Sequence, residues 1–405
     1  MTDSVGVSLD ALLHAARAAR AIRPDVPLAL ATLVDVEGSS FRQPGARLLV
    51  YAECRCLAGA ISGGCLEADV ASRAKAVCAS GVADYLVYDL RDDLQAIWGF
   101  DAACDGVAHI LLEPLHDTAW LEAAVELRRA RKRGSVLTLV KVEPIMNGSD
   151  QPSRAVDHMS EGIDRTQRIG VAAGTVGASL PGAIAANGGT VSLLHTVGET
   201  QRASLGTITI DDASIRLFAD PLLPPVALHV IGAGRGAEAF ARIGASIGWQ
   251  VTIVDHRPAL LESLSLPAGV NCRHARPEQA SELVADAFSA VALMTHIFDI
   301  DRRWLEALLP RNHGYIGVLG SRQRAERLLG AIEPMAKTPL HAPIGLDIGG
   351  EGPESIALAT IAEIHAVMHA RPGGPLRERR SPIHDRTPVP VANAEAIRAA
   401  CRLLE

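Results

Sequence analysis

The segment Ser62–Val70, with the sequence SGGCLEADV, holds the residues of this chain that are best suited to chemistry. Gly63 and Gly64 can take backbone angles closed to other residues, which lets the main chain approach a ligand closely. Cys65 follows them and precedes an expected helix, whose dipole would favour the thiolate. A thiolate can bind a soft metal, attack a disulfide or carry sulfur. Cys65 is therefore a candidate reactive or ligand-binding residue, and the alternative is a small buried side chain beside a tight turn.

A polar hairpin upstream supplies groups that bind anions. Residues 28–36 are predicted to form a buried strand, Pro44-Gly45 a tight turn, and residues 48–51 the returning strand. The connection between the strands would carry Ser39, Ser40, Arg42 and Arg47. Guanidinium groups, hydroxyls and free backbone N–H groups are what a phosphate needs. This loop is a candidate phosphate site, and the alternative is an ordinary hairpin with solvated arginines.

A second thiol lies in the glycine-flanked turn Cys104-Asp105-Gly106. If Cys104 lies near Cys65, the two make a two-thiol site; the sequence does not fix that distance, and an isolated buried cysteine is the alternative. The seven cysteines are odd in number and scattered. This pattern is typical of reduced thiols in a cytoplasmic protein.

The C-terminal half contains a dinucleotide-binding fingerprint. Gly232, Gly234 and Ala237 fit G-x-G-x-x-A between a predicted strand and a predicted helix. The next predicted strand ends in Asp255, at the usual spacing of about 20 residues. The second glycine would admit a pyrophosphate at the helix N-terminus, and Asp255 could accept hydrogen bonds from ribose hydroxyls. The pattern predicts a Rossmann-type fold.

Further polar residues follow later strands of the same predicted sheet. Thr295-His296 ends one strand, and Ser321 and Arg322 follow another. In an open parallel sheet, ligands bind beyond the carboxyl ends of the strands. His296 could be a proton donor, an anion ligand or a metal ligand; the alternative is a histidine that is merely hydrogen-bonded.

The elements predict an α/β protein of two domains and a tail. The first, residues 1–220, is a mixed α/β domain with a middle insertion at about residues 145–200. The second, residues 226–370, is a Rossmann-like domain with a doubly wound parallel sheet. Residues 371–405 form a tail rich in proline and arginine. Asp220 to Pro225 are expected to be a linker, and Ser192–Val197 and residues 207–210 are predicted to be strands.

The composition favours a globular protein. Hydrophobic residues make up 48% and charged residues 21% of the chain, as in soluble globular proteins. Aromatic residues are only 3%, too few for a base-stacking surface, and the net charge of −7 provides no basic footprint. No apolar run approaches the ~20 residues that span a bilayer, and the N-terminus lacks the layout of a secretory signal. We therefore expect no nucleic-acid and no membrane partner.

Several ordered motifs resemble the XdhC/CoxI family, accessory factors for xanthine dehydrogenase and related molybdenum hydroxylases. GSSFRQPGARLLV, SGGCLE and CDGVAHILLEPL are similar to the family's N-terminal domain. HVIGAG, the Thr-His pair, YIGVLGSR, and PIGLDIG followed by PESIA are similar to its C-terminal Rossmann domain. The resemblance covers both ends of the chain and leaves out residues 145–200.

The resemblance implies a carrier and insertion chaperone for the molybdenum cofactor rather than a catalyst. Such proteins bind the pterin-dithiolene cofactor, hold it while a cysteine desulfurase exchanges an oxo ligand for a sulfido ligand, and deliver it to the apo-hydroxylase. Cys65, and with it Cys104, would approach molybdenum or relay sulfur. The Rossmann domain would grip the phosphate, or the nucleotide of a dinucleotide form of the cofactor. The anionic part of the cofactor would be held by Ser39, Ser40, Arg42 and Arg47.

Two positions depart from the family pattern. The family often has an acidic residue after the histidine of the Thr-His motif, whereas Ile297 follows His296 here. Arg235 stands where some members have a histidine, and it adds positive charge beside the phosphate site. Asp255 disfavours a 2′-phosphate on the nucleotide. The Rossmann site could therefore take NAD or another nucleotide.

Two other functions fit parts of the chain. The fingerprint with His296 could serve an NAD(P)-dependent oxidoreductase, although no obvious acid–base pair accompanies that histidine. In a pure interaction adaptor, Cys65 would be inert. Each predicted domain offers half a cleft, so a site at a domain or dimer interface, and hence a homo-oligomer, is expected.

Overall fold

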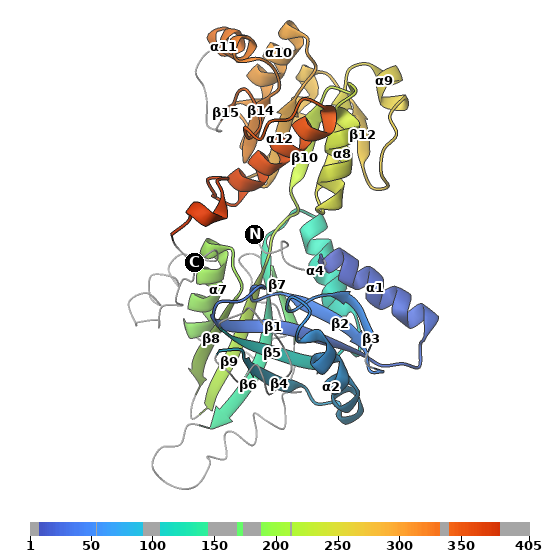
Figure 1. The fold of residues 1–405 in the computed structure, drawn as a ribbon, viewed down its shortest axis with the longest axis vertical. Coiled ribbons are helices and arrows are strands. Elements are labelled where there is room, and N and C mark those ends of the chain that lie inside the picture. The colour runs from blue at the N-terminus through green and yellow to red at the C-terminus, as the bar shows by residue number, and fades with distance from the viewer. Residues whose placement is uncertain are drawn as a thin grey trace. The chain divides into compact units, whose positions relative to one another are not determined.

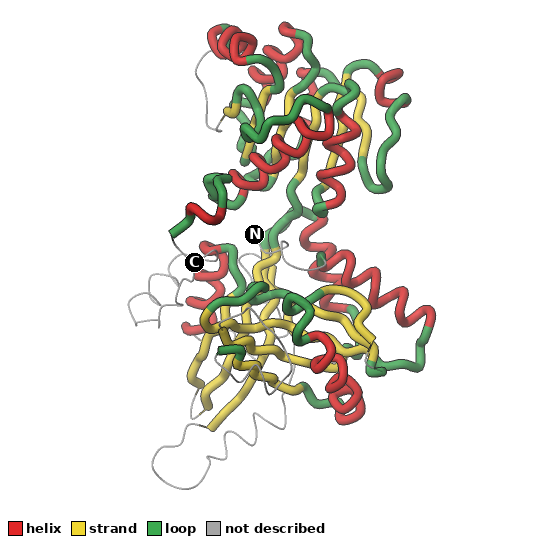
Figure 2. The backbone as a smooth tube through the Cα atoms, in the orientation of Figure 1, coloured by secondary structure: helices red, strands yellow, loops and turns green. Residues whose placement is uncertain are grey.

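The computed structural model describes residues 8–53, 55–91, 106–144, 168–172, 188–210, 213–332 and 340–380. The chain forms two compact units, with the first ending at Pro224 and the second beginning at Pro225. Figure 1 labels their helices and strands, and Figure 2 separates helices, strands and loops by colour. The predictions for Cys104, for residues 145–167 and for the tail beyond residue 380 lie outside the described residues.

A five-stranded antiparallel sheet forms the centre of the first unit. Its order is β3-β2-β1-β5-β4. Strands β1 and β2 pair in antiparallel register from Leu28 opposite Tyr51 to Thr32 opposite Arg47, and this pairing confirms the predicted hairpin. The strands are β1 (Leu28–Gly38), β2 (Arg47–Tyr51), β3 (Arg55–Gly59), β4 (Asp84–Asp89) and β5 (Gly106–Pro114).

Helices cover both faces of this sheet because side chains alternate along its strands. Ala31 and Leu33 of β1 belong to the core beneath α2 (Glu67–Ser80). Leu30, on the opposite face, packs in the core formed with α1 (Leu9–Ile22) and α4 (Ala119–Arg129).

A second, four-stranded antiparallel sheet follows, in the order β7-β6-β9-β8. Val34 and Leu111 of the first sheet share a small core with Val140 and Phe218 of the second. The strands are β6 (Gly134–Pro144), β7 (Arg168–Ala172), β8 (Ser204–Ile210) and β9 (Ala213–Leu222). The strand predicted at residues 207–210 is confirmed within β8.

Two local predictions in this region are wrong. Ser192–Val197 belongs to the helix α7 (Gly188–Thr200) rather than to a strand. Leu193 and Val197 are four residues apart and both buried, which is the helical period that a short apolar run conceals. Asp220 does not begin a linker, because β9 continues to Leu222 and pairs with β6 along its length.

The second unit is a six-stranded parallel sheet in the order β12-β11-β10-β13-β14-β15. This is the 3-2-1-4-5-6 order of the doubly wound fold, and it confirms the Rossmann-like prediction. The chain reverses its direction of winding between β10 and β13, where ligands bind in such folds. The strands are β10 (Ala227–Ile231), β11 (Gln250–Asp255), β12 (Asn271–His274), β13 (Ser289–Leu293), β14 (Tyr315–Val318) and β15 (Leu340–His341).

Helices cover both faces of the parallel sheet (Figure 1). On one face, α8 (Ala237–Ser246) lies beside α12 (Pro353–Met368). On the other, α10 (Phe298–Leu308) and α11 (Arg322–Gly330) pack on a core that includes Ile231 and Leu293. Short turns complete the unit: α9 (Pro258–Glu262) and the 3₁₀ turns Pro277–Glu282 and Leu376–Glu378. None of the described helices has the length and hydrophobicity that a membrane-spanning segment requires.

Candidate functional site

The hairpin end and the strand that follows Cys104 meet in the first unit. The register of β1 and β5 places Gly38 opposite Gly106. A Cβ atom on Gly106 would lie 2.3 Å from the carbonyl oxygen of Ser39 and 2.4 Å from that of Glu37. Such contacts are too short for any side chain, so glycine is required where these two motifs touch.

An internal network fixes the SGGC loop in place. The Glu67 carboxylate accepts hydrogen bonds from the backbone N–H groups of Ile61, at 3.1 Å, and Ser62, at 2.8 Å, and from the Ser62 hydroxyl. The Ser62 Oγ in turn accepts from the N–H groups of Gly64 and Leu66, each at 3.1 Å. Burial disfavours the Glu67 anion, but the bonds from Ser62 outweigh it and lower the pKa of Glu67. The loop is therefore held rigidly by a carboxylate that the sequence motifs alone did not single out.

Cys65 is half-buried at the start of α2. Its side chain packs at the margin of the core beneath that helix, which begins two residues later. Gly64, which precedes Cys65 in the chain, has a φ of +114°, and a Cβ atom on it would meet nothing within 4 Å, so the space beside Gly64 is open. Glu67 and Asp69 place two carboxylates in the first turn of this helix.

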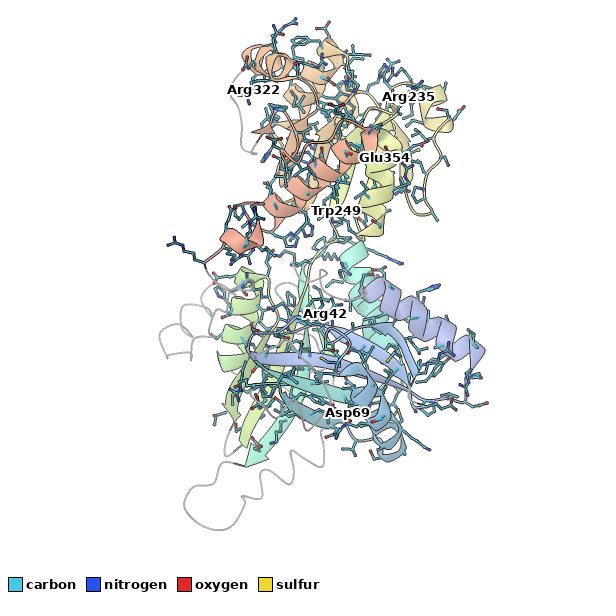
Figure 3. All side chains as sticks on the ribbon, in the orientation of Figure 1. Arg42, Asp69, Arg235, Trp249, Arg322 and Glu354 are labelled. Atoms are coloured by element: carbon cyan, nitrogen blue, oxygen red, sulfur yellow. The ribbon has the colours of Figure 1, made fainter. Side chains whose placement is uncertain are left out.

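Arg42, which is labelled in Figure 3, connects the hairpin to the SGGC loop. Its Nε atom donates to the carbonyl oxygen of Ser62 at 3.4 Å, and its backbone N–H donates to the Oγ of Ser40 at 3.3 Å. Its guanidinium lies 5.4 Å from the centre of the Phe41 ring, which is 63% exposed. The structure thus brings Ser40, Arg42, Gly63 and Cys65 into one surface region. Phe41 also belongs to it and was missed; an aromatic residue in a polar loop of an aromatic-poor chain was the signal that could have found it.

Arg47 has a different environment from Arg42. Its Nη2 atom lies 2.5 Å from Oδ2 of Asp220, and the two side chains are only 7% and 6% exposed. Its Nη1 atom donates to the carbonyl oxygen of Gly45 at 3.2 Å. The structure therefore commits Arg47 to a buried ion pair between the two sheets of the first unit rather than to the hairpin surface.

The glycine loop of the second unit lies where the sheet reverses its winding. Gly232 has a φ of +120°, and a Cβ atom on it would lie 2.5 Å from the carbonyl oxygen of Met294, just beyond β13. A Cβ atom on Gly234 would meet nothing within 4 Å, and α8 begins three residues later, at Ala237. The loop thus combines a close approach between strands with open space before a helix N-terminus, which suits a phosphate.

Replacing Gly234 with alanine should weaken nucleotide binding without changing the stability of the fold. The methyl group would enter the open space, so the free energy of unfolding should change by less than about 0.5 kcal/mol. Affinity for any dinucleotide that binds this loop should fall by about tenfold, because the methyl group would enter the space that a pyrophosphate takes in dinucleotide-binding folds. Titration calorimetry and urea unfolding would measure the two effects. Gly232→Ala is the contrasting variant, and it should lose about 1–3 kcal/mol of stability through backbone strain; equal effects of both variants on stability would contradict this assignment.

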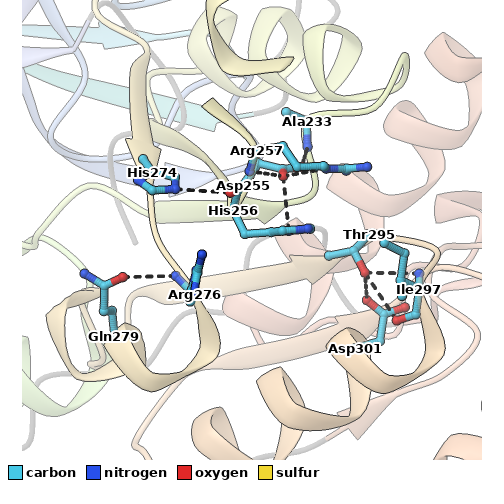
Figure 4. A network of polar contacts seen from close by, with 10 residues as sticks. All are labelled: Ala233, Asp255, His256, Arg257, His274, Arg276, Gln279, Thr295, Ile297 and Asp301. Carbon is cyan, nitrogen blue, oxygen red and sulfur yellow. Dashed lines mark hydrogen bonds and ion pairs between the residues drawn. The ribbon is translucent and has the colours of Figure 1, made fainter. Parts of the chain in front are cut away.

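Asp255 is enclosed by its neighbours (Figure 4). Its Oδ2 atom accepts from the backbone N–H of Ala233, in the glycine loop, at 2.7 Å. Arg257 forms an ion pair with the same carboxylate at 2.9 Å, and the Asp255 side chain is 0% exposed. Burial disfavours the Asp255 anion, but the hydrogen bonds from Arg257 and from the backbone N–H of Ala233 stabilise it more strongly, so the pKa of Asp255 is lowered. The carboxylate therefore ties β11 to the glycine loop.

His296 is exposed beyond β13 and has a φ of +61°, which is rare for a residue other than glycine. The neighbouring Thr295 hydroxyl donates to Oδ1 of Asp301 at 2.5 Å and accepts from the N–H of Ile297 at 3.2 Å. Arg324 donates to the other oxygen of Asp301 at 2.7 Å. These bonds hold the loop in its strained form, with the imidazole outward. The sequence analysis did not identify Asp301 as a residue of this loop, because its only signal in the sequence is its place in the first turn of α10.

The last predicted residues lie at the start of α11. The Oγ atom of Ser321 accepts from the N–H of Arg324 at 3.3 Å, so Ser321 is the N-cap of that helix. Arg322 follows as an exposed residue, and Figure 3 shows it in the same unit as Arg235. Ser321 thus has a structural role of its own, whereas Arg322 and Arg235 present charge to solvent.

The described part of the chain offers no preformed metal centre. Within the described ranges, no group of three or more His, Cys, Asp and Glu side chains could hold a metal ion. The described cysteines Cys56, Cys65, Cys78 and Cys272 are free thiols. Among the described residues, Cys65 therefore belongs to no such group.

Comparisons with known proteins give the family. The model of the XdhC and CoxI family matches residues 21–89, and that of the XdhC Rossmann domain matches residues 228–364. A probable xanthine dehydrogenase subunit of Bacillus subtilis (strain 168) is 30% identical over 341 residues, or 83% of this chain and 91% of that protein. The uncharacterized protein YqeB of Escherichia coli (strain K12) is 30% identical over 158 residues, or 36% of this chain and 28% of that protein.

A solved structure shows the same fold. A crystal structure described as a xanthine dehydrogenase from Bacillus halodurans has a TM-score of 0.65 and 24% sequence identity, and the match covers 92% of this chain and 97% of that one. The two family models together include the hairpin, the SGGC loop and the glycine loop. The chain therefore belongs to the XdhC/CoxI family.

Proposed function

We propose that the chain is an accessory factor that binds the molybdenum cofactor, protects it during sulfuration and delivers it to an apo molybdenum hydroxylase of the xanthine dehydrogenase type. The observation that carries the proposal is the meeting of Arg42 with the SGGC loop, through the bond from its Nε atom to Ser62. Family membership and the name of the Bacillus subtilis relative point to the same class of client enzyme.

The groups in this region suit the chemistry of the cofactor as a cargo. A phosphate is anionic, and Arg42 together with the hydroxyls of Ser39 and Ser40 can bind it by charge-assisted hydrogen bonds. The open backbone at Gly64 lets a ligand approach the thiol of Cys65. A thiolate is a soft ligand, which fits a metal already bound to sulfur. The molybdopterin and dinucleotide forms both carry these features.

The rigid loop suggests how the site works. Because Glu67 and Ser62 hold the loop through backbone N–H groups, the thiol keeps its place whether or not cargo is present. Pre-organisation of this kind avoids an ordering cost when a ligand binds. A cysteine desulfurase would act on the held cofactor, and the apo-hydroxylase would receive it, in the cytoplasm. We propose that a homo-oligomer performs this task.

The role of Cys65 is testable by client activation. Cys65→Ala should reduce sulfido loading of a co-expressed hydroxylase by about tenfold or more, because losing even a residue that only hydrogen-bonds to a metal ligand costs about 10- to 100-fold. Cys56→Ala is the matched control, because Cys56 is an exposed thiol of the same unit on β3. Cyanide-releasable sulfur in the purified hydroxylase measures the loading. Equal loading with both variants would contradict the role given to Cys65.

A second candidate function rests on the strained loop at His296. An exposed imidazole at the reversal point of a Rossmann sheet is suitably placed for an NAD(P)-dependent oxidoreductase. Nucleotide turnover that is lost in His296→Gln would favour this function over the carrier.

A further inference from the structure

The hydrogen bonds of Asp255 leave no position for a ribose. An ionised carboxylate has about four acceptor positions. Asp255 receives bonds from the N–H of Ala233 at 2.7 Å and from the N–H, Nε and Nη2 of Arg257, each at 2.9 Å. The side chain is also 0% exposed. The ribose hydroxyls that an acidic residue binds at this place in NAD-binding folds therefore find no acceptor here.

Arg257 is fixed and remains available for an anion. A guanidinium carries five N–H donors, and Nε and Nη2 point to Asp255. The remaining donors belong to a side chain that is 40% exposed. The buried carboxylate thus serves as a rigid backing that holds the guanidinium in one orientation, so little side-chain entropy is lost when an anion binds.

Other polar side chains with ring or guanidinium nitrogens lie at and just beyond the ends of β11 and β12 (Figure 4). The Nδ1 atom of His256 lies 3.3 Å from Asp255. His274 is in register with Asp255, and its Nε2 atom bonds the carbonyl oxygen of His256 at 3.1 Å. Arg276 follows as an exposed residue, while Glu278 beyond it is paired with Arg303. The strand ends thus carry two guanidinium groups and two imidazoles near an acid whose charge is already paired with Arg257.

We infer that this edge of the Rossmann unit recognises a ribose phosphorylated at its 2′ position, so the unit binds an NADP-type dinucleotide in preference to an NAD-type one. An acid that binds the 2′-hydroxyl selects NAD, whereas a nearby arginine accommodates the 2′-phosphate. The contacts of Asp255 prevent it from binding a 2′-hydroxyl, whereas Arg257 is oriented to bind a 2′-phosphate. The expectation that Asp255 disfavours a 2′-phosphate is therefore reversed. The inference goes beyond the proposed carrier function and does not depend on it.

Titration calorimetry of the full chain tests the inference directly. The probes are NADPH against NADH, and adenosine 2′,5′-bisphosphate against adenosine 5′-monophosphate, at one fixed salt concentration. The phosphorylated member of each pair should bind about ten- to a hundredfold more tightly, as expected for charge-assisted bonds to a phosphate. Equal binding within a pair, tighter binding of the unphosphorylated member, or no binding of any probe would overturn the inference.

Two variants test which residues cause the preference. Arg257→Gln removes the cation and frees Asp255, so binding of NADPH should weaken by about tenfold while binding of NADH strengthens. Arg276→Gln changes an exposed residue without freeing Asp255, so binding of NADPH should weaken less and binding of NADH should stay unchanged. Thermal unfolding shows whether Arg257→Gln is folded. If it is not, the comparison of the two ligand pairs and the Arg276→Gln variant still show whether the unit prefers the 2′-phosphate. A preference that is unchanged in both folded variants would remove these residues from the site.

Discussion

Asp220→Asn should lower the free energy of unfolding of the N-terminal unit by about 3–5 kcal/mol, the usual cost of leaving a buried charge without its partner. Arg47 would keep its charge, yet its carboxylate partner at 2.5 Å would be gone. The variant would also destabilise the charged form of Arg128. Burial lowers the pKa of Arg128 to about 10, and the negative charge of Asp220 opposes that shift. Asp220 thus supports two buried guanidinium groups in one unit.

Hydrogen exchange is the suitable measurement, because a chain of two units need not unfold in one step. Protection of amides in β2 and β9 should fall in Asp220→Asn, while protection in β10 should not. A double variant, Arg47→Met with Asp220→Leu, removes both charges of the ion pair and should recover the part of the loss that is due to Arg47, while Arg128 still lacks the Asp220 carboxylate. A loss below about 1 kcal/mol in the single variant would be typical of an exposed ion pair and would contradict this assignment.

Lowering the pH from 7 to 5 should destabilise the Rossmann unit by about 2 kcal/mol through His313 alone. Burial lowers the pKa of His313 from 6.5 to about 4, and its Nδ1 atom lies 2.8 Å from the buried Ser289 hydroxyl. The unfolded chain binds this proton more readily than the folded one. The stabilisation is therefore complete above pH 6.5 and is lost as the pH falls toward 4.

Urea unfolding at pH 7 and pH 5, followed by amide signals in β13 and β14 so that the Rossmann unit is observed separately, measures this effect. Other groups titrate in the same range, so the comparison is between the pH dependence of the natural chain and that of His313→Gln. The variant should be less stable at pH 7, yet its stability should fall by about 2 kcal/mol less between the two pH values. The same pH dependence in both proteins would show that another group is responsible.

Local patterns were sufficient to predict most of the fold. The hairpin and the glycine loop each depend on residues close together in the sequence, so periodicity and turn residues indicated them correctly. The α7 helix was missed because Leu193 and Val197 lie in a short apolar run in which the strand and helix periods are hard to distinguish.

The site was predictable only where its residues are neighbours in the sequence. The glycines and Cys65 were found because their types and order already indicate a function. The burial of Arg47 was not predictable, since its partner Asp220 lies 173 residues away. The contacts of Asp255 were missed for another reason: a fingerprint names the acid but does not show that Arg257, two residues later, fills its acceptor positions.

The carrier function is best tested by the molybdenum and pterin content of the protein purified anaerobically from a host that makes the cofactor. We expect near-stoichiometric molybdenum and pterin in the natural chain and in Cys56→Ala, and a loss of about tenfold in Cys65→Ala. A natural chain that is purified without either component, binds a nicotinamide dinucleotide and shows redox turnover would contradict the carrier function and support the oxidoreductase.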